Sequence, residues 1–128
     1  MPPYKRELAM NAKLLEQLPR YPSPPHLLSS GDDGRPHAVA VTVRVDGNEL
    51  VLRAGKRSLA NVSARKLVSV LWGAPSADDY SLIVDGEARV SGNDAELRIT
   101  ITRAVLHRPG APRDVTGSAC GSDCVPLI

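Results

Sequence analysis

Alternating hydrophobic and polar residues are the clearest pattern in this chain, and they predict β-strands. In residues 37–45 every second position is a valine, and the positions between are mostly small or polar. One face carries Val39, Val41, Val43 and Val45, and the other carries Ala38, Ala40, Thr42 and Arg44. This period of two indicates a half-buried strand. The small-residue face leaves room for a flat ligand, unless another element of the chain packs there closely.

Five other segments have strand character and are separated by turn signals such as Asp46-Gly47-Asn48. They cover residues 26–30, 49–54, 68–72, 80–91 and 96–107. Asp85-Gly86 within residues 80–91 permits two readings: a second tight hairpin, or one continuous strand with a bulge or close backbone approach at Gly86. Six strands joined mostly by tight turns predict an antiparallel barrel or sandwich.

Two helices are predicted beside the strands. The first spans residues 4–18, where Leu8, Ala12, Leu15 and Leu18 share one face and Pro19 ends the helix. It packs either on the outside of the main body or on a second subunit. The second spans residues 58–66, with Ser58 as its N-cap. The predicted organisation is an N-terminal helix and proline-rich linker (1–25), a barrel domain (26–107) and an irregular C-terminal tail (108–128).

Composition narrows the classes of function. A chain of 128 residues is the length of one domain, and a net charge of +2 implies no general polyanion-binding surface. Aromatic residues make up 3%, too few for the stacked rings that hold single-stranded nucleic acid. The sequence shows neither an apolar run long enough to span a membrane nor a signal peptide. We therefore expect a cytoplasmic protein that binds neither nucleic acid nor membrane.

A basic loop before the second predicted helix is the strongest candidate for chemistry. Lys56, Arg57 and Ser58 combine two cations and a hydroxyl at a helix start, a combination that favours an anionic oxygen group such as phosphate. Asn61 lies one helical turn further on and shares the face of Ser58. The alternative reading of Lys56 and Arg57 is a solvated basic turn.

Other candidates have weaker signals. Trp72 and Tyr80 flank residues 73–79 and form either a wall against an aromatic cofactor or ordinary core packing. Cys120 and Cys124 together with His107 are too few for a structural zinc site, which needs four ligands. The two cysteines are close enough for a strained local disulfide, but free thiols are the expected state in a cytosolic protein. No known catalytic or metal motif is present, so the sequence names no catalytic side chain.

The order of segments between residues 34 and 92 resembles the pyridoxamine 5'-phosphate oxidase-like, FMN-binding split-barrel family. A G-x-P turn leads into a valine-rich strand, followed by a DG hairpin and a return strand. A basic, hydroxyl-bearing loop then precedes a short helix that contains Asn61-Val62, and a V-x-G-x-A strand appears as residues 84–88. The resemblance implies a six-stranded antiparallel split barrel with Greek-key connections. It also favours the continuous-strand reading at Gly86.

The resemblance further implies a homodimer with FMN or the deazaflavin coenzyme F420 in a groove between the protomers. The residues it assigns to the cofactor are Ala40, Val41 and Thr42 near the ring, Lys56, Arg57 and Ser58 at the phosphate, and Asn61 behind them. Trp72, named above as a wall against the cofactor, completes the candidate site. The implied activity is oxidation or reduction of a small molecule. The family's pyridoxal-phosphate-reading C-terminal extension is absent, and Ser58 replaces a lysine found in many members. A non-catalytic flavin- or haem-binding module and a cofactor-free dimer are the alternatives.

Overall fold

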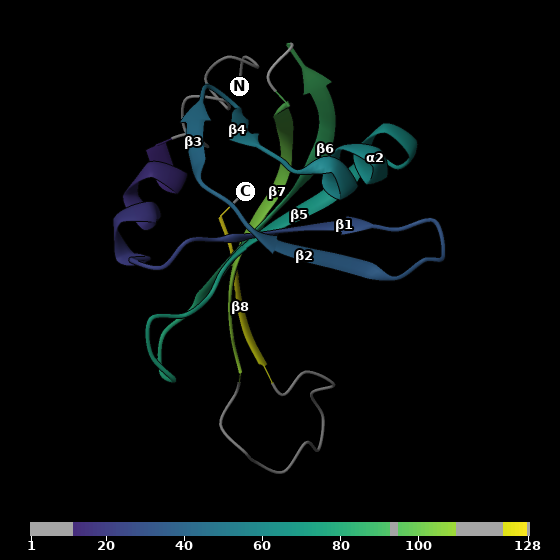
Figure 1. Ribbon diagram of the computed structural model, residues 1–128. Helices are drawn as coiled ribbons and strands as arrows, with labels where there is room; N and C mark the ends of the chain where they lie inside the picture. Colours follow the sequence, from purple (N-terminus) through teal and green to yellow (C-terminus); the bar gives the residue numbers. More distant parts are fainter. Residues whose placement is uncertain (1–11, 93–94, 110–121, 128) are drawn as a thin grey trace.

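A single antiparallel sheet of eight strands forms the body of the protein in the computed structural model, which describes residues 12–92, 95–109 and 122–127 (Figure 1). The strands are β1 (His26–Ser30), β2 (Pro36–Ala40), β3 (Val43–Asp46), β4 (Glu49–Arg53), β5 (Leu67–Trp72), β6 (Ser81–Ser91), β7 (Glu96–Pro109) and β8 (Ser122–Pro126). The helices are a helical segment at residues 12–17 that continues into the 3₁₀-helix η1 (Leu18–Arg20), and α2 (Lys56–Ala64). The mainly β fold is therefore confirmed.

The strand order explains why the sheet curls into a barrel. The order is β2-β1-β5-β6-β7-β4-β3, with β8 added to the far end of β7. The edge strands β2 and β3 follow each other in the chain, and only Val41 and Thr42 separate them. Three Cα–Cα steps reach about 11 Å at most, so the two edges must meet at this joint. No ladder pairs β2 with β3 among the described strands, which leaves the barrel split there.

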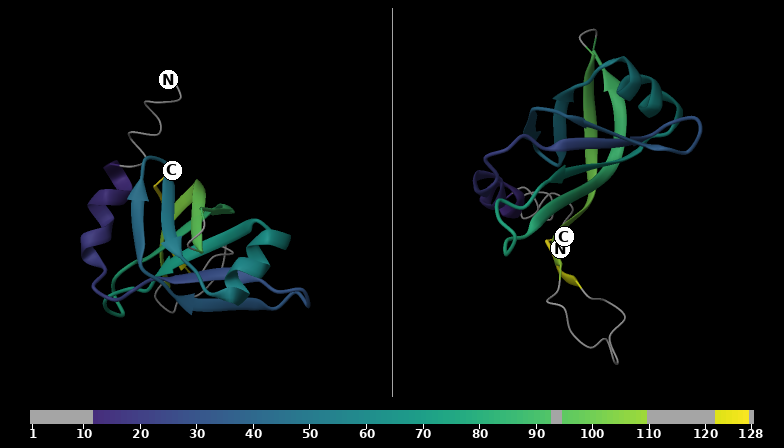
Figure 2. Two further views of the ribbon diagram at one scale, coloured as in Figure 1. Left: turned by 45° about the horizontal axis from the view of Figure 1, so that its top comes forward. Right: turned by 60° about the horizontal axis from the view of Figure 1, so that its bottom comes forward.

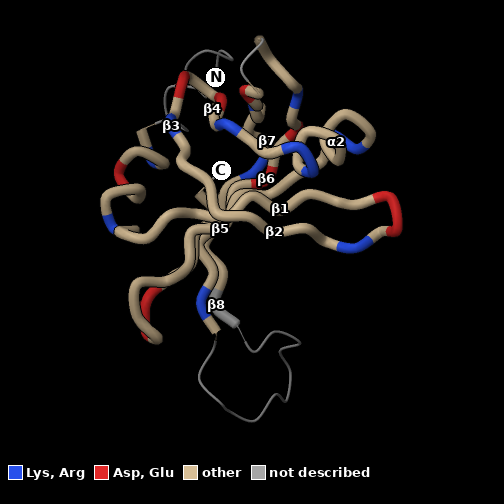
Figure 3. The backbone as a smooth tube through the Cα atoms, viewed as in Figure 1, with Lys and Arg blue, Asp and Glu red and all other residues tan. Residues whose placement is uncertain are grey.

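The hydrophobic positions that alternate along the predicted strands point into the core of the barrel, as the sequence predicts. Inward-facing side chains of the central strands are fully buried, including Leu27, Leu50, Val70, Leu82, Val84, Leu97 and Ile99. In residues 37–45 the valine face is buried or half-buried, whereas Ala38, Ala40, Thr42 and Arg44 are exposed. Basic and acidic positions are scattered over the whole fold rather than gathered on one side (Figure 3).

Gly86 confirms the continuous-strand reading of residues 80–91. β6 runs unbroken through Asp85-Gly86, and its register with β7 shifts between these two residues, as a β-bulge requires. A Cβ atom at Gly86 would lie 2.4 Å from the Thr100 carbonyl oxygen and 2.5 Å from Ile99 Cγ2. The two strands therefore approach too closely for any side chain at this position.

The strand count differs from the six predicted, for two reasons. The predicted strand 37–45 is divided at Val41 and Thr42, because its two halves pair with different neighbours, β1 and β4. The C-terminal tail was expected to be irregular from Arg108, but Arg108 and Pro109 belong to β7, and residues 122–126 form β8 alongside it. Pairing with the exposed end of β7 supplies backbone partners that the tail's composition does not reveal.

The helices also differ in detail. Helix α2 begins at Lys56 with Gly55 as its N-cap, two residues before the predicted start, so Ser58 is not the N-cap. At the N-terminus Leu14, rather than Leu15, enters the core: Leu14 is 1% exposed and Leu15 is 49% exposed. Because Leu14 joins the core of its own chain, the described part of this helix packs in cis. The rest of the predicted helix, residues 4–11, lies outside the described residues.

The two helical segments lie on opposite sides of the barrel (Figure 2). The N-terminal segment is tied to the C-terminal end by a hydrogen bond of 3.3 Å from Lys13 Nζ to the Leu127 carbonyl. No helix in the described part of the chain is long and apolar enough to cross a membrane.

Candidate functional site

A cavity of about 770 Å³ lies at the joint between β2 and β3. Its lining residues are Pro24, Ala40, Val41, Thr42, Val43, Arg44, Val51, Leu52, Arg53 and Glu96. Ala40 and Thr42 are exposed, so no described element of the chain packs closely over this small-residue face. The side chain of Val41 turns into the core, and its backbone N–H donates to the Pro25 carbonyl at 3.0 Å. The backbone of the joint is thereby held in place as one wall of the cavity.

Cations border this largely apolar cavity. Arg44 extends from β3 and lies 3.5 Å from a carboxylate oxygen of Glu96, while Arg53 stands exposed at the end of β4. Lys56 and Arg57 follow Arg53 closely in the chain and form the first turn of α2, where both are exposed. Neither Lys56 nor Arg57 forms an ion pair within the described part of the chain. An apolar wall bordered by the side chains of Arg44 and Arg53 suits a flat ligand that carries an anionic group.

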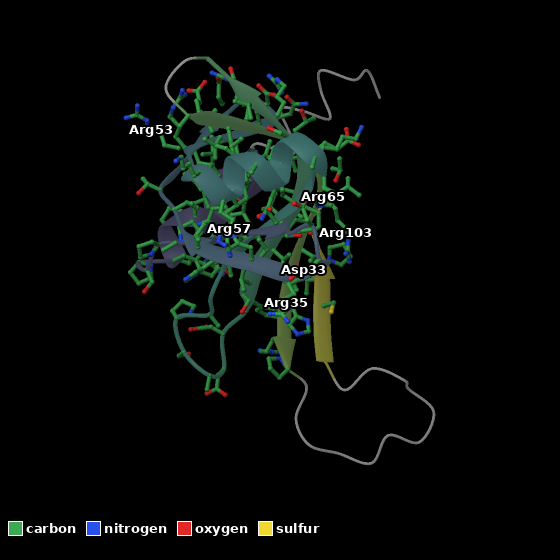
Figure 4. The ribbon with its side chains drawn as sticks, turned by 45° about the vertical axis from the view of Figure 1, so that its right-hand side comes forward. Asp33, Arg35, Arg53, Arg57, Arg65 and Arg103 are labelled. Atoms are coloured by element: carbon green, nitrogen blue, oxygen red, sulfur yellow. The ribbon has the colours of Figure 1, made fainter. Side chains whose placement is uncertain are left out.

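A second cavity, of about 540 Å³, lies between the β1–β2 hairpin and α2. It is lined by Gly31, Asp32, Asp33, Arg35, Pro36, His37, Arg57, Ala60 and Asn61. In Figure 4 Arg57 lies between α2 and the hairpin, Asp33 and Arg35 stand on the hairpin, and Arg53 lies apart from them. The structure thus divides the predicted site residues: Ala40, Val41 and Thr42 line the joint cavity, and Arg57 and Asn61 line this hairpin cavity.

Ser58 and Asn61 lie inside the protein rather than on its surface. Ser58 is 1% exposed and Asn61 is 6% exposed. The Asn61 side-chain amide donates a hydrogen bond of 3.0 Å to the hydroxyl of Ser29, which is also buried. This bond joins α2 to β1 and orients the helix turn that carries Arg57. The assignment of Ser58 and Asn61 to the cofactor stays a prediction. The hydrogen bond observed for Asn61 holds α2 against β1.

Trp72 packs as the alternative reading expected. Its side chain is 5% exposed within the hydrophobic core and does not line the joint cavity. Tyr80 is half-buried, with the Arg108 guanidinium 4.5 Å from its ring centre. The Tyr21 hydroxyl donates to the Tyr80 carbonyl at 2.9 Å, and burial raises the pKa of Tyr21. These contacts attach the linker to the start of β6.

The remaining candidates form no metal centre within the described residues. His107 Nδ1 lies 3.2 Å from Cys124 Sγ across the β7–β8 pair, and Cys120 lies outside the described residues. A charged network that the sequence did not single out connects β4 with β6 and β7: Glu49 accepts hydrogen bonds from Arg89 and Arg98. The hydrogen bond from Arg89 is the main cause that lowers the pKa of Glu49, and the bond from Arg98 adds to it.

Comparisons of the sequence with known proteins find relatives among mycobacterial proteins. A scan against protein-family models gives no match. The uncharacterized proteins Mb0449c of Mycobacterium bovis and MT0457 of Mycobacterium tuberculosis are each 36% identical over 129 residues, covering 88% of this chain and 90% of theirs.

Solved structures share the fold at lower identity. A Listeria innocua protein assigned as a pyridoxamine 5'-phosphate oxidase has a TM-score of 0.60 at 20% identity, covering 78% of this chain and 96% of its own. An F420 reductase has a TM-score of 0.57 at 17% identity, covering 70% and 94%. A heme binding protein from Mycobacterium smegmatis has a TM-score of 0.55 at 16% identity, covering 99% of this chain and 59% of its own. This chain therefore has the split-barrel fold of the pyridoxamine 5'-phosphate oxidase-like proteins, and it belongs to the same family as the two mycobacterial proteins.

Proposed function

We propose that this protein is an oxidoreductase that binds a flavin-type cofactor, either FMN or the deazaflavin coenzyme F420, and oxidises or reduces a small molecule. The observation that carries the proposal is the joint cavity, which the exposed Ala40 and Thr42 line together with Arg53, three residues before Lys56 at the start of α2. A volume of about 770 Å³ is within the range of cofactor pockets, roughly 300–1,000 Å³.

The residues present fit the chemistry of such a cofactor. The apolar wall at Ala40 and Val41 would receive the ring, because neither residue has a bulky outward side chain. Lys56 and Arg57 would hold the phosphate by charge-assisted hydrogen bonds, and both are exposed and form no ion pair in the described structure. Hydride transfer is the chemistry that the bound cofactor supplies. The role of the chain is then to bind, orient and exclude water, which requires no catalytic acid or base.

A homodimer belongs to the same proposal. The small-residue face of β2 is exposed in one chain, and the joint cavity opens to solvent beside it. A second copy that covers this face would exclude water from the ring and complete the pocket. Sedimentation of the purified protein tests this part separately, and a monomer at micromolar concentration would contradict it.

The fold's solved neighbours support the class of cofactor without choosing a member. One is named an F420 reductase and another is assigned as a pyridoxamine 5'-phosphate oxidase. The likeness to a heme binding protein favours one second candidate, a module that binds haem or flavin without turnover.

The test is a visible spectrum of the protein as isolated, followed by melting curves with FMN, F420 or haemin. A ligand that binds only the native state at one hundred times its Kd adds about 2.7 kcal/mol of stability, or about 10 °C for a chain of this size. A rise with FMN or F420, followed by reduction of the bound cofactor by a physiological donor, supports the oxidoreductase. A rise with haemin alone favours the second candidate, and no response to any of the three contradicts both.

A further inference from the structure

A thiol and an imidazole meet on the strand pair β7–β8, which projects away from the barrel (Figure 1). Cys124 is a free cysteine on β8, and its side chain is exposed. His107 lies directly opposite on β7, and His107 Nδ1 is 3.2 Å from Cys124 Sγ. A nucleophile and a base at this separation are within hydrogen-bonding reach. Neither residue lines the joint cavity or the hairpin cavity, so the pair is separate from the candidate cofactor site.

The pairing of the strands fixes the positions of the two groups. Directly opposed residues of an antiparallel pair point to the same face of the sheet. Because Ser81 of β6 lies opposite His107 in turn, the three residues Ser81, His107 and Cys124 form one row across three strands. The Leu127 N–H donates to the Ala104 carbonyl at 2.9 Å, which holds the end of β8 against β7. The thiol and the imidazole therefore meet on paired strands rather than on a loop.

The surroundings of the pair leave the imidazole available as a base. Arg108 follows His107 in the chain and, by alternation, belongs to the other face, where its guanidinium lies 4.5 Å from the Tyr80 ring centre. No carboxylate forms an ion pair with His107 in the part of the chain that the structure describes. A neutral imidazole has one ring nitrogen that can accept a proton. The described neighbours on the same face are all uncharged: Ser81, Val105, Pro109 and Pro126.

We infer that Cys124 is a nucleophilic thiol that forms mixed disulfides with low-molecular-weight disulfides, and that His107 is the base that accepts its proton. The Cys124 sulfur attacks one sulfur of the disulfide, and a new S–S bond forms as the old one breaks. The thiol proton passes to His107 Nδ1 and from there to the departing sulfur, which leaves as a thiol. Cys124 is oxidised and the departing half of the reagent is reduced, so no further oxidant is required. This modification site goes beyond the proposed function and does not depend on a cofactor.

The probe is 2-hydroxyethyl disulfide, which is small and uncharged. A Cys120→Ser parent protein leaves Cys124 as its one cysteine, and intact-mass spectrometry follows the rate of adduct formation. An ordinary thiol is only about 3% ionised at pH 7. We expect the folded parent to react at least about tenfold faster at pH 7 than the same protein unfolded in urea, because unfolding separates the thiol from His107. Near pH 9.5, where thiols ionise without a base, the two rates should agree within about twofold.

Two histidine variants in the same Cys120→Ser parent identify the base. His107→Asn keeps a polar side chain but cannot take up the proton. His26→Asn is the matched control, since His26 is an exposed histidine on β1, which β5 and β6 separate from β7 in the sheet. At pH 7 the His107→Asn protein should react at about the rate of the unfolded parent. The His26→Asn protein should react as the folded parent does.

Two results would overturn the inference. One is that the folded parent reacts with the probe no faster than the unfolded parent at pH 7. The other is that His107→Asn and His26→Asn react at the same rate. The comparison of the folded and unfolded parent needs no histidine variant, so it decides the question even if His107→Asn does not fold.

Discussion

Replacing Gly86 with alanine tests the close approach of β6 and β7 that shapes the barrel. The backbone at Gly86 is not left-handed, so the requirement for glycine is one of space alone. The added Cβ would lie 2.4 Å from the Thr100 carbonyl oxygen, and the strands must separate by about 1 Å to relieve the overlap. The oxygen belongs to the backbone of a paired strand, so it cannot move without disturbing the β6–β7 ladder.

The expected cost combines two effects. Overpacking in a close-packed interior costs about 1–3 kcal/mol, and a weakened ladder hydrogen bond adds about 1 kcal/mol. The free energy of unfolding should fall by about 2–4 kcal/mol in Gly86→Ala, a large fraction of the roughly 5–15 kcal/mol typical of a domain. The control is Gly73→Ala, because a Cβ at Gly73 meets nothing within 4 Å. The control should stay within about 0.5 kcal/mol of the wild type.

Urea unfolding followed by tryptophan fluorescence measures both variants, since Trp72 is buried and is the single tryptophan of the chain. With an m-value near 2 kcal/mol/M, the midpoint of Gly86→Ala should fall by about 1–2 M at unchanged slope. A midpoint for Gly86→Ala equal to that of Gly73→Ala would refute the register and the close approach described for these strands.

Two further predictions concern side chains that join α2 to the β1–β2 hairpin, and a third concerns the charged network of Glu49 on β4. Asn61→Ala should lower the free energy of unfolding by about 1–3 kcal/mol, because the hydroxyl of Ser29 loses its buried donor; an unchanged urea midpoint would contradict this. Arg65→Ala should lower the free energy of unfolding by about 1–2 kcal/mol, because the guanidinium makes two hydrogen bonds to the β1–β2 hairpin. Arg65→Lys should be destabilised as well, since an ammonium group cannot make both bonds with the same geometry; a lysine variant as stable as the wild type would contradict this. The hydrogen bond from Arg89 lowers the pKa of Glu49 in the folded protein. Above the unfolded-state pKa of about 4.3 the ionised carboxylate contributes its full stabilisation to the fold. This stabilisation is lost as the pH falls through the lower pKa of the folded state. Glu49→Gln should therefore be less stable than the wild type at neutral pH, and the difference should shrink as the pH falls below about 4.3, as measured by urea unfolding over a series of pH values; a constant difference would contradict the assignment.

Local patterns predicted most of the strands because period-two alternation depends only on neighbouring residues. Residues 26–30 were expected as a strand and form β1 with the same bounds. The division of residues 37–45 could not be predicted in the same way. Alternation of burial continues through Val41 and Thr42, and only the strand order shows that the two halves pair with different neighbours. Closure of a barrel is a property of distant pairings that no short segment encodes.

The candidate site was partly accessible from the sequence. The outward face at Ala40 and Thr42 followed from alternation, and it lines the joint cavity. The burial of Ser58 and Asn61 did not follow, because it depends on α2 packing against β1, which lies about thirty residues away in the chain. The sequence did contain a signal for His37 that was missed. This histidine falls on the same strand face as Val39 and Val41, so the same alternation directs its ring inward.

Helical spacing alone did not identify which face of the N-terminal helix is buried. Both Leu14 and Leu15 fit helical spacing with Leu18, and the predicted stripe used Leu15. The structure turns Leu14 into the core, where Leu14 packs with strands far from it in the sequence. A helix with adjacent leucines has two possible apolar faces, and the barrel surface decides between them.

The most direct test of the central claim is a titration of the cofactor-free protein with FMN and with F420. The double variant Lys56→Ala/Arg57→Ala would be compared with Lys66→Ala/Arg103→Ala, which removes the same charge from exposed positions outside both cavities. Loss of two charge-assisted bonds should weaken binding of the preferred cofactor by about one hundredfold or more in the first variant, with unchanged stability. The second variant should bind as the wild type does. Equal affinity in all three proteins, or no binding in any, would contradict the claim that this split barrel holds a flavin-type cofactor at the start of α2.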